Sequence, residues 1–171
     1  MRLIDTHSHI FLEEFSEDLP QVIERARAVG ITHIFMPNID STTIDAMLSV
    51  CNTYKGYCFP MIGLHPTSVN ADYERELEFV ARELESSREY VAIGEVGMDL
   101  YWDKTFLKEQ QTVLDRQINW ALEYELPVVI HCRDAFDYIY KVLEPYKNTP
   151  LKGIFHSCLL YTSPSPRDVE E

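Results

Sequence analysis

Two histidines separated by one residue, His7 and His9, follow a short apolar run near the start of the chain. Side chains two residues apart in an extended segment point to the same face. Two imidazoles on one face can share a divalent cation, since neutral imidazole is a common metal ligand. A lone histidine is usually structural, but a His-x-His directly after Asp5-Thr6 is much less often so. The pair therefore predicts a metal site.

Three further side chains of ligand type lie within or directly after apolar runs. Glu95 lies among apolar residues, where an acid is costly unless it is metal-bound or, as the alternative, held in a buried ion pair. His131 and His156 each stand where a strand gives way to a loop. Catalytic groups of parallel barrels gather at the C-terminal ends of strands. We therefore expect five ligands to meet around bound cations: His7, His9, Glu95, His131 and His156.

Other polar residues share the predicted rim. His65 follows the third apolar run, and a substrate contact is expected there. Arg133 follows His131 and could donate two parallel hydrogen bonds to a phosphate group, although a salt bridge with a neighbouring acid fits equally well. Asp99 lies at the same rim. His33, early in the second run, is interpreted as structural.

Strand-like runs alternate with helical stretches along the chain, which predicts a parallel sheet of buried strands. The predicted strands are residues 2–7, 31–36, 57–64, 90–96, 126–132 and 152–157. The predicted helices are residues 20–29, 41–54, 72–86, 105–124 and 135–146. A doubly wound sheet and a barrel both fit this α/β alternation. A barrel is favoured because Asp5-Thr6-His7-Ser8-His9 stands where a dinucleotide fingerprint would follow the first strand.

Composition narrows the classes of function. The net charge of −13 argues against a broad basic surface that grips nucleic acid. It leaves a phosphate substrate possible, because bound metal ions supply positive charge locally. No apolar run of roughly 18 residues is present, so no membrane helix is expected. The start of the chain has no signal-peptide pattern, and no C-x-x-C pair occurs, so reduced thiols and a cytoplasmic location are expected.

The end of the chain departs from this alternation. Thr162-Ser163-Pro164-Ser165-Pro166 can neither continue a central strand nor form a helix interior. The peptide resembles one translated reading frame of a sequencing adapter. We therefore predict that residues 1–157 form a partial barrel and that residues 158–171 are a non-native tail, the alternative being a real Pro-rich tail. A complete barrel has eight strands in about 250 residues, and six βα units are expected here.

Five motifs resemble, in order, those of the TatD family of metal-dependent deoxyribonucleases. The motifs are Asp5–His9, Gly63–Pro66, Gly94–Asp99, Pro127–Ala135 and Phe155–Ser157. The resemblance runs from residue 1 to about residue 157. It implies an incomplete TIM-type barrel, two divalent ions (Mg²⁺, Mn²⁺ or Zn²⁺) and a nucleic acid substrate, with single-stranded DNA expected and neither a membrane nor an obligate protein partner.

The resemblance also implies roles for the ligands. His7 and His9 would hold one metal, His131 and His156 would lie on the other side, and Glu95 would bridge them as the catalytic carboxylate. The expected reaction is phosphodiester hydrolysis of DNA. One alternative is hydrolysis of an ester or small molecule, such as an aminoacyl ester on tRNA. Another is an inactive fragment, because the family pattern includes an Asp ligand on a later strand.

Overall fold

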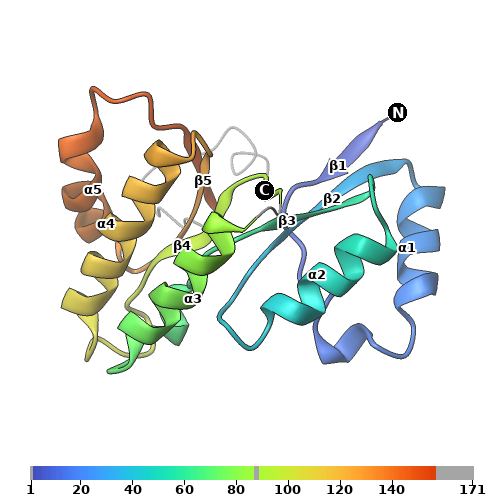
Figure 1. Ribbon diagram of the computed structural model, residues 1–171, viewed down its shortest axis with the longest axis horizontal. Helices are drawn as coiled ribbons and strands as arrows, with labels where there is room; N and C mark the ends of the chain where they lie inside the picture. Colours follow the sequence, from blue (N-terminus) through green and yellow to red (C-terminus); the bar gives the residue numbers. More distant parts are fainter. Residues whose placement is uncertain (1, 87–88, 157–171) are drawn as a thin grey trace, which may run out of the picture.

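A computed structural model describes residues 2–86 and 89–156 of the 171-residue chain. Strands and helices alternate throughout (Figure 1). The strands are β1 Leu3–Asp5, β2 Ile31–Pro37, β3 Cys58–Met61, β4 Ile93–Asp99, β5 Val128–Arg133 and β6 Gly153–His156. The helices are α1 Leu19–Ala28, α2 Ile44–Thr53, α3 Tyr73–Glu85, α4 Leu107–Glu123 and α5 Phe136–Leu143, with 3₁₀ turns η1 Glu13–Phe15, η2 Pro66–Ser68 and η3 Glu144–Tyr146. None of these helices is long and apolar enough to cross a membrane.

The strands follow one another in space as they do in sequence. They form two three-stranded parallel sheets, β1-β2-β3 and β4-β5-β6. A single bridge between Ile62 and Ile93 joins the two sheets. Figure 1 shows α1 and α2 beside the first sheet and α4 and α5 beside the second. Sequential parallel strands with helices outside are the arrangement of an incomplete (β/α) barrel, so the predicted fold class is confirmed.

The sequence prediction placed the ends of several strands incorrectly. The fourth strand continues to Asp99 instead of ending at Val96, and the fifth continues to Arg133. The first strand ends at Asp5, so His7 and His9 lie in the segment after it. The predicted boundary at residue 157 and the predicted tail lie outside the described residues, and both remain predictions.

The core is built from strands that are buried on both faces. Every residue of β4 is buried, and the inner faces of α3 and α4 cover the sheet. Leu77, Val80 and Leu84 form the buried stripe of α3, at the i, i+3, i+7 spacing of one helix face. Each such side chain contributes roughly 1.5–3 kcal/mol when it is fully buried. The apolar packing therefore fixes β4 at the centre of the molecule.

Two buried glutamines of α4 hold the backbone near the ends of neighbouring strands. The Gln117 amide accepts a hydrogen bond from the Leu64 N–H at 2.7 Å and donates one to the Leu64 carbonyl at 3.2 Å. Gln110 does the same for Asp99, at 2.9 and 3.2 Å. The glutamines are seven residues apart, so they lie on one face of the helix. They satisfy backbone groups that the strand ladder leaves unpaired.

Asn38 forms a third amide clamp, directly after β2. Its Nδ2 donates to the carbonyl of Gly63 at 3.0 Å, and its Oδ1 accepts from the Thr43 hydroxyl at 2.8 Å. Its backbone N–H lies within hydrogen-bonding distance of the carbonyls of Met61 and Gly94. The C-terminal ends of β2 and β3 and the beginning of β4 are therefore fixed relative to one another.

Replacing Gln117 by Leu tests this clamp. The substitution preserves much of the side-chain volume but leaves the N–H and C=O of Leu64 buried without partners. We expect the free energy of unfolding to fall by about 2–4 kcal/mol, measured by urea denaturation. Gln111→Leu, at a partly exposed position of the same helix, is the control. Equal stability of the two variants would contradict the clamp.

Candidate metal centre

His7 and His9 point their Nε2 atoms at the same carboxylate oxygen. The Nε2 of His7 lies 3.0 Å from Glu95 Oε2, and that of His9 lies 3.6 Å from it. The two Nε2 atoms are 3.3 Å apart. Asp5, the last residue of β1, accepts a hydrogen bond from the His7 backbone N–H at 3.1 Å, which fixes the turn after the strand. The histidine pair thus converges on one point above Glu95.

The other oxygen of Glu95 faces β5. His131 Nδ1 lies 3.1 Å from Glu95 Oε1, a position that follows from the pairing of Gly97 with His131 between β4 and β5. His65 approaches from the loop after β3, with its Nε2 3.6 Å from Glu95 Oε2. His156 pairs with His131 in the sheet, and its ring stacks on that of His7 at 3.5 Å between centroids.

Glu95 is common to two groups of potential ligands. Ligand atoms of His7, His9 and Glu95 lie within 4.8 Å of one another, and so do those of His65, Glu95 and His131. The buried Nδ1 atoms of His7 and His9 have no hydrogen-bond partner among the described residues. Several imidazole nitrogens lie close to one buried carboxylate, which is the arrangement of ligands around a bound cation. A ligand set of imidazole and carboxylate suits Zn²⁺ or Mn²⁺. The residues therefore fit a metal centre.

Burial and hydrogen bonds set the charges in the site. Burial would raise the pKa of the Glu95 carboxyl, but hydrogen bonds from His131, His7 and His9 outweigh burial and hold this pKa below its usual value. Burial lowers the pKa of His65 to about 4, so its imidazole is neutral at pH 7. Burial also opposes protonation of His131, but the two carboxylates beside it raise its pKa.

Asp99 is the second carboxylate on His131. The buried Asp99 side chain places Oδ2 2.9 Å from His131 Nε2, while Nδ1 of the same ring faces Glu95. A carboxylate on the far nitrogen of a metal-binding imidazole fixes its tautomer and orientation. The sequence analysis placed Asp99 at this rim but did not predict its contact with His131. The spacing of four residues from Glu95 on one strand could have indicated a common face.

Gly97 lets the two strands approach closely between these acids. It has a φ of 134°, and a Cβ at this position would overlap the backbone carbonyl oxygen of His131. A side chain would therefore push β5 away and move His131 from Glu95. A glycine within a strand often marks such a close approach of two backbones.

A model of the TatD related DNase family matches residues 4–163. The chain belongs to this family. The predicted TatD-family membership is therefore confirmed, and it agrees with both the order of the five motifs and the fold.

Three TatD-related proteins illustrate the similarity. The uncharacterized metal-dependent hydrolase YabD of Bacillus subtilis (strain 168) is 35% identical over 154 residues, 90% of this chain and 60% of YabD. The 3'-5' ssDNA/RNA exonuclease TatD of Pantoea sp. (strain At-9b) is 30% identical over 90% of this chain and 59% of that protein. The crystal structure of YJJV, a TatD homolog from Escherichia coli K12, superposes with a TM-score of 0.82 at 31% identity, over 99% of this chain and 63% of that one. The chain thus spans about 60% of the length of the curated relatives.

Two other residues from the sequence analysis, Arg133 and His33, lie outside the cluster of imidazoles around Glu95. The guanidinium carbon of Arg133 lies 3.8 Å from the centroid of the Tyr101 ring, and Arg133 forms no ion pair within residues 2–86 and 89–156. The alternative of a salt bridge therefore finds no support there. The His33 ring, in β2, stacks on Phe59 at 5.4 Å and takes no part in the cluster.

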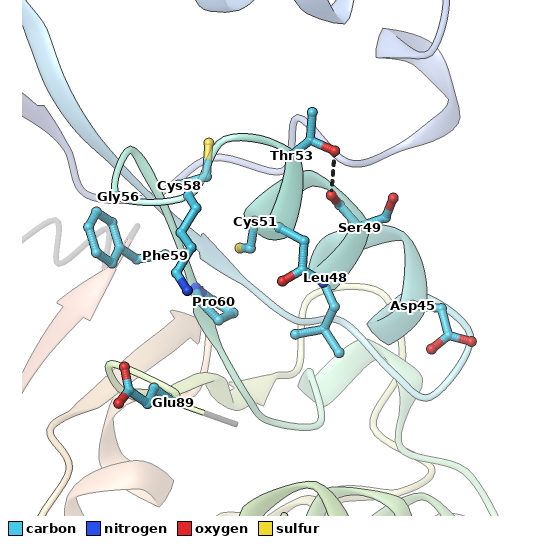
Figure 2. A pocket seen from close by; sticks show the side chains of 12 residues that line it. Asp45, Leu48, Ser49, Cys51, Thr53, Gly56, Cys58, Phe59, Pro60 and Glu89 are labelled. Atoms are coloured by element: carbon cyan, nitrogen blue, oxygen red, sulfur yellow. Dashed lines mark hydrogen bonds between the residues drawn. The ribbon is translucent and has the colours of Figure 1, made fainter. Parts of the chain in front are cut away.

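A large depression lies away from the cluster, between α2 and the beginning of β3 (Figure 2). It measures about 1040 Å³ and is lined by Cys51, Cys58 and Glu89 among others. Burial raises the pKa of Cys51 to about 12 and that of Cys58 to about 11, so both thiols are protonated at neutral pH. Protonated thiols are poor nucleophiles. The depression therefore offers neither a nucleophile nor the imidazole cluster.

Asp99→Asn tests how His131 is held. The variant removes the negative charge from His131 Nε2 and permits the wrong tautomer. We expect Mn²⁺ affinity to fall about 10–100-fold, measured by titration calorimetry. Asp103→Asn, an exposed substitution four residues further along, is the control and should bind Mn²⁺ like the wild type. Unchanged affinity in Asp99→Asn would rule out this positioning role.

Proposed function

We propose that the protein is a divalent-metal-dependent hydrolase that cleaves phosphodiester bonds of single-stranded DNA. The observation that carries the proposal is that imidazoles approach both oxygens of the Glu95 carboxylate, with His7, His9 and His65 at Oε2 and His131 at Oε1. A carboxylate placed in this way can bridge two cations, a recurring arrangement of phosphodiester-cleaving sites. Relatives of similar sequence are named 3'-5' ssDNA/RNA exonuclease and metal-dependent hydrolase.

Each residue of the cluster receives a role in this proposal. His7, His9 and Glu95 would hold one ion, and Glu95 and His131 would hold a second. His156, the further ligand that the sequence predicts for the second ion, lies outside the ligand-spaced group of His65, Glu95 and His131. Bound divalent ions, here Mg²⁺, Mn²⁺ or Zn²⁺, supply Lewis acidity and lower the pKa of water. Glu95 stays ionised at neutral pH because three histidines donate to it. Asp99 holds the Nε2 proton of His131, so that Nδ1 of this ring stays directed at the centre.

Two residues are proposed to contact the substrate. His65 is neutral at pH 7 and lies beside Glu95 and His131, where it can meet a phosphate oxygen or complete the ligand set. Arg133, free of ion pairs with described residues, can donate two parallel hydrogen bonds to a phosphate group. Arg133 adds a positive charge and His65 adds a hydrogen-bonding imidazole to the site of a strongly acidic chain. The substrate is thus gripped locally instead of across a basic surface.

We also propose that the enzyme works in the cytoplasm without an obligate protein partner. Cys51 and Cys58 are buried free thiols, the state that a reducing compartment maintains. This assignment is independent of the chemistry at Glu95.

The nuclease proposal is tested by release of nucleotides from single-stranded DNA in Mg²⁺ or Mn²⁺. We expect metal-dependent cleavage by the wild type and a loss of at least about 100-fold in kcat in His7→Ala and Glu95→Gln, since each removes a group that organises charge at the reacting phosphate. His33→Ala, remote from the cluster, should retain activity.

Two results would redirect the proposal. Absence of metal-dependent cleavage by the wild type would reject phosphodiester hydrolysis of DNA. Release of an amino acid from aminoacyl-tRNA, lost in the same two variants, would instead assign the site to ester hydrolysis. Calorimetry with Mn²⁺ separates a loss of metal from a loss of chemistry in each variant.

A further inference from the structure

Two large aromatic side chains are exposed in the loop after β4. Tyr101 is 51% exposed and Trp102 is 76% exposed. Their rings make an edge-to-face pair, with centroids 4.7 Å apart and an angle of 89°. Contiguous exposed apolar surface often marks a binding site, and here two large aromatic rings are exposed side by side. Neither ring is needed for the buried core.

Arg133 completes this surface from the end of β5. Its guanidinium carbon lies 3.8 Å from the Tyr101 centroid and 5.4 Å from the Trp102 centroid. The cation is held by aromatic faces, and within the described residues no carboxylate pairs with it. Because the chain carries a net charge of −13, a guanidinium without an acidic partner among the described residues is available to an external anion. We call Tyr101, Trp102 and Arg133 the aromatic platform.

The platform is tied to the metal centre through Asp99. One Asp99 oxygen lies 2.9 Å from His131 Nε2, and the other accepts the backbone N–H of Tyr101 at 3.1 Å. The sheet register pairs Asp99 with Arg133, two residues after His131. A ligand bound to the platform therefore lies beside the imidazole cluster. This connection separates the platform from other exposed tyrosines, such as Tyr140 on α5.

We infer that the aromatic platform is a stacking subsite for one base of a single-stranded nucleic acid, with Arg133 donating to the adjacent phosphate. The inference rests on the proposed function, because it names a subsite for the same substrate. Every base has a π face, so stacking on Trp102 tolerates any sequence. Bases of a duplex are already stacked on both sides, so the platform favours single strands. The exposed indole stacks on the base of a nucleotide, and the guanidinium donates to its phosphate.

Tryptophan fluorescence tests the stacking directly. The chain has two tryptophans, exposed Trp102 and partly buried Trp120 on α4. Titration of the Mg²⁺-loaded protein with a phosphorothioate oligothymidylate should quench the fluorescence of the wild type and of Trp120→Phe. The quenching should disappear in Trp102→Phe. An abasic oligonucleotide of the same length should quench far less, and equal quenching by both would reject base stacking.

Kinetics give a second readout. We compare kcat/KM for an oligothymidylate with that for bis(p-nitrophenyl) phosphate, which carries no base. The ratio should fall about tenfold in Trp102→Ala, recover largely in Trp102→Phe, and stay unchanged in the control Tyr140→Ala. An unchanged ratio in Trp102→Ala, with intact cleavage by the wild type, would overturn the platform and leave the proposed function standing. Base-dependent quenching at Trp102 without any cleavage would support the platform and reject the nuclease.

Discussion

The buried charge of Glu95 is the constraint on which the rest of the site depends. A carboxylate on a strand that is buried on both faces is costly unless positive groups or hydrogen-bond donors surround it. His7, His9, His65 and His131 supply these groups from three different segments. Four imidazoles face the two oxygens of this one carboxylate. A divalent cation between the nitrogen atoms and the oxygens would interact with both more strongly than they interact with each other. The atoms that offset the buried charge of Glu95 are therefore the same atoms that would bind the metal.

Such a cluster holds its geometry only if the strand ends that carry it are rigid. The amides of Asn38, Gln110 and Gln117 provide this rigidity, since each bonds backbone groups near the place where a strand ends. A helix places two of these amides at once, because α4 presents one face along the sheet. The ends of β2, β3 and β4 are thus joined by polar contacts within an apolar core. A rigid frame of this kind keeps ligand atoms at fixed distances.

The convergence of His7, His9, Glu95 and His131 could be predicted because it follows from topology alone. Parallel strands bring their C-terminal ends to one edge, whatever their exact lengths. The contacts of Gln110 and Gln117 could not be predicted, because they depend on the tertiary position of α4 against particular backbone groups. The end of β4 was also misplaced, because the strand continues past Val96 to Asp99, where Gly97 permits close packing on β5.

The acidity of the chain and an anionic substrate can be reconciled at the mouth of the partial barrel. A net charge of −13 repels nucleic acid at long range. Binding of the proposed substrate would therefore rely on short-range contacts, which salt screens less than long-range charge interactions. In the function proposed above, cations bound at Glu95 would attract the scissile phosphate, and Arg133 on its aromatic support would attract a neighbouring one. Stacking adds an attraction that carries no charge and is therefore unaffected by the repulsion. Recognition by a few polarised and aromatic groups would suit the proposed nuclease, which must release each product, since a broad basic surface would retain it.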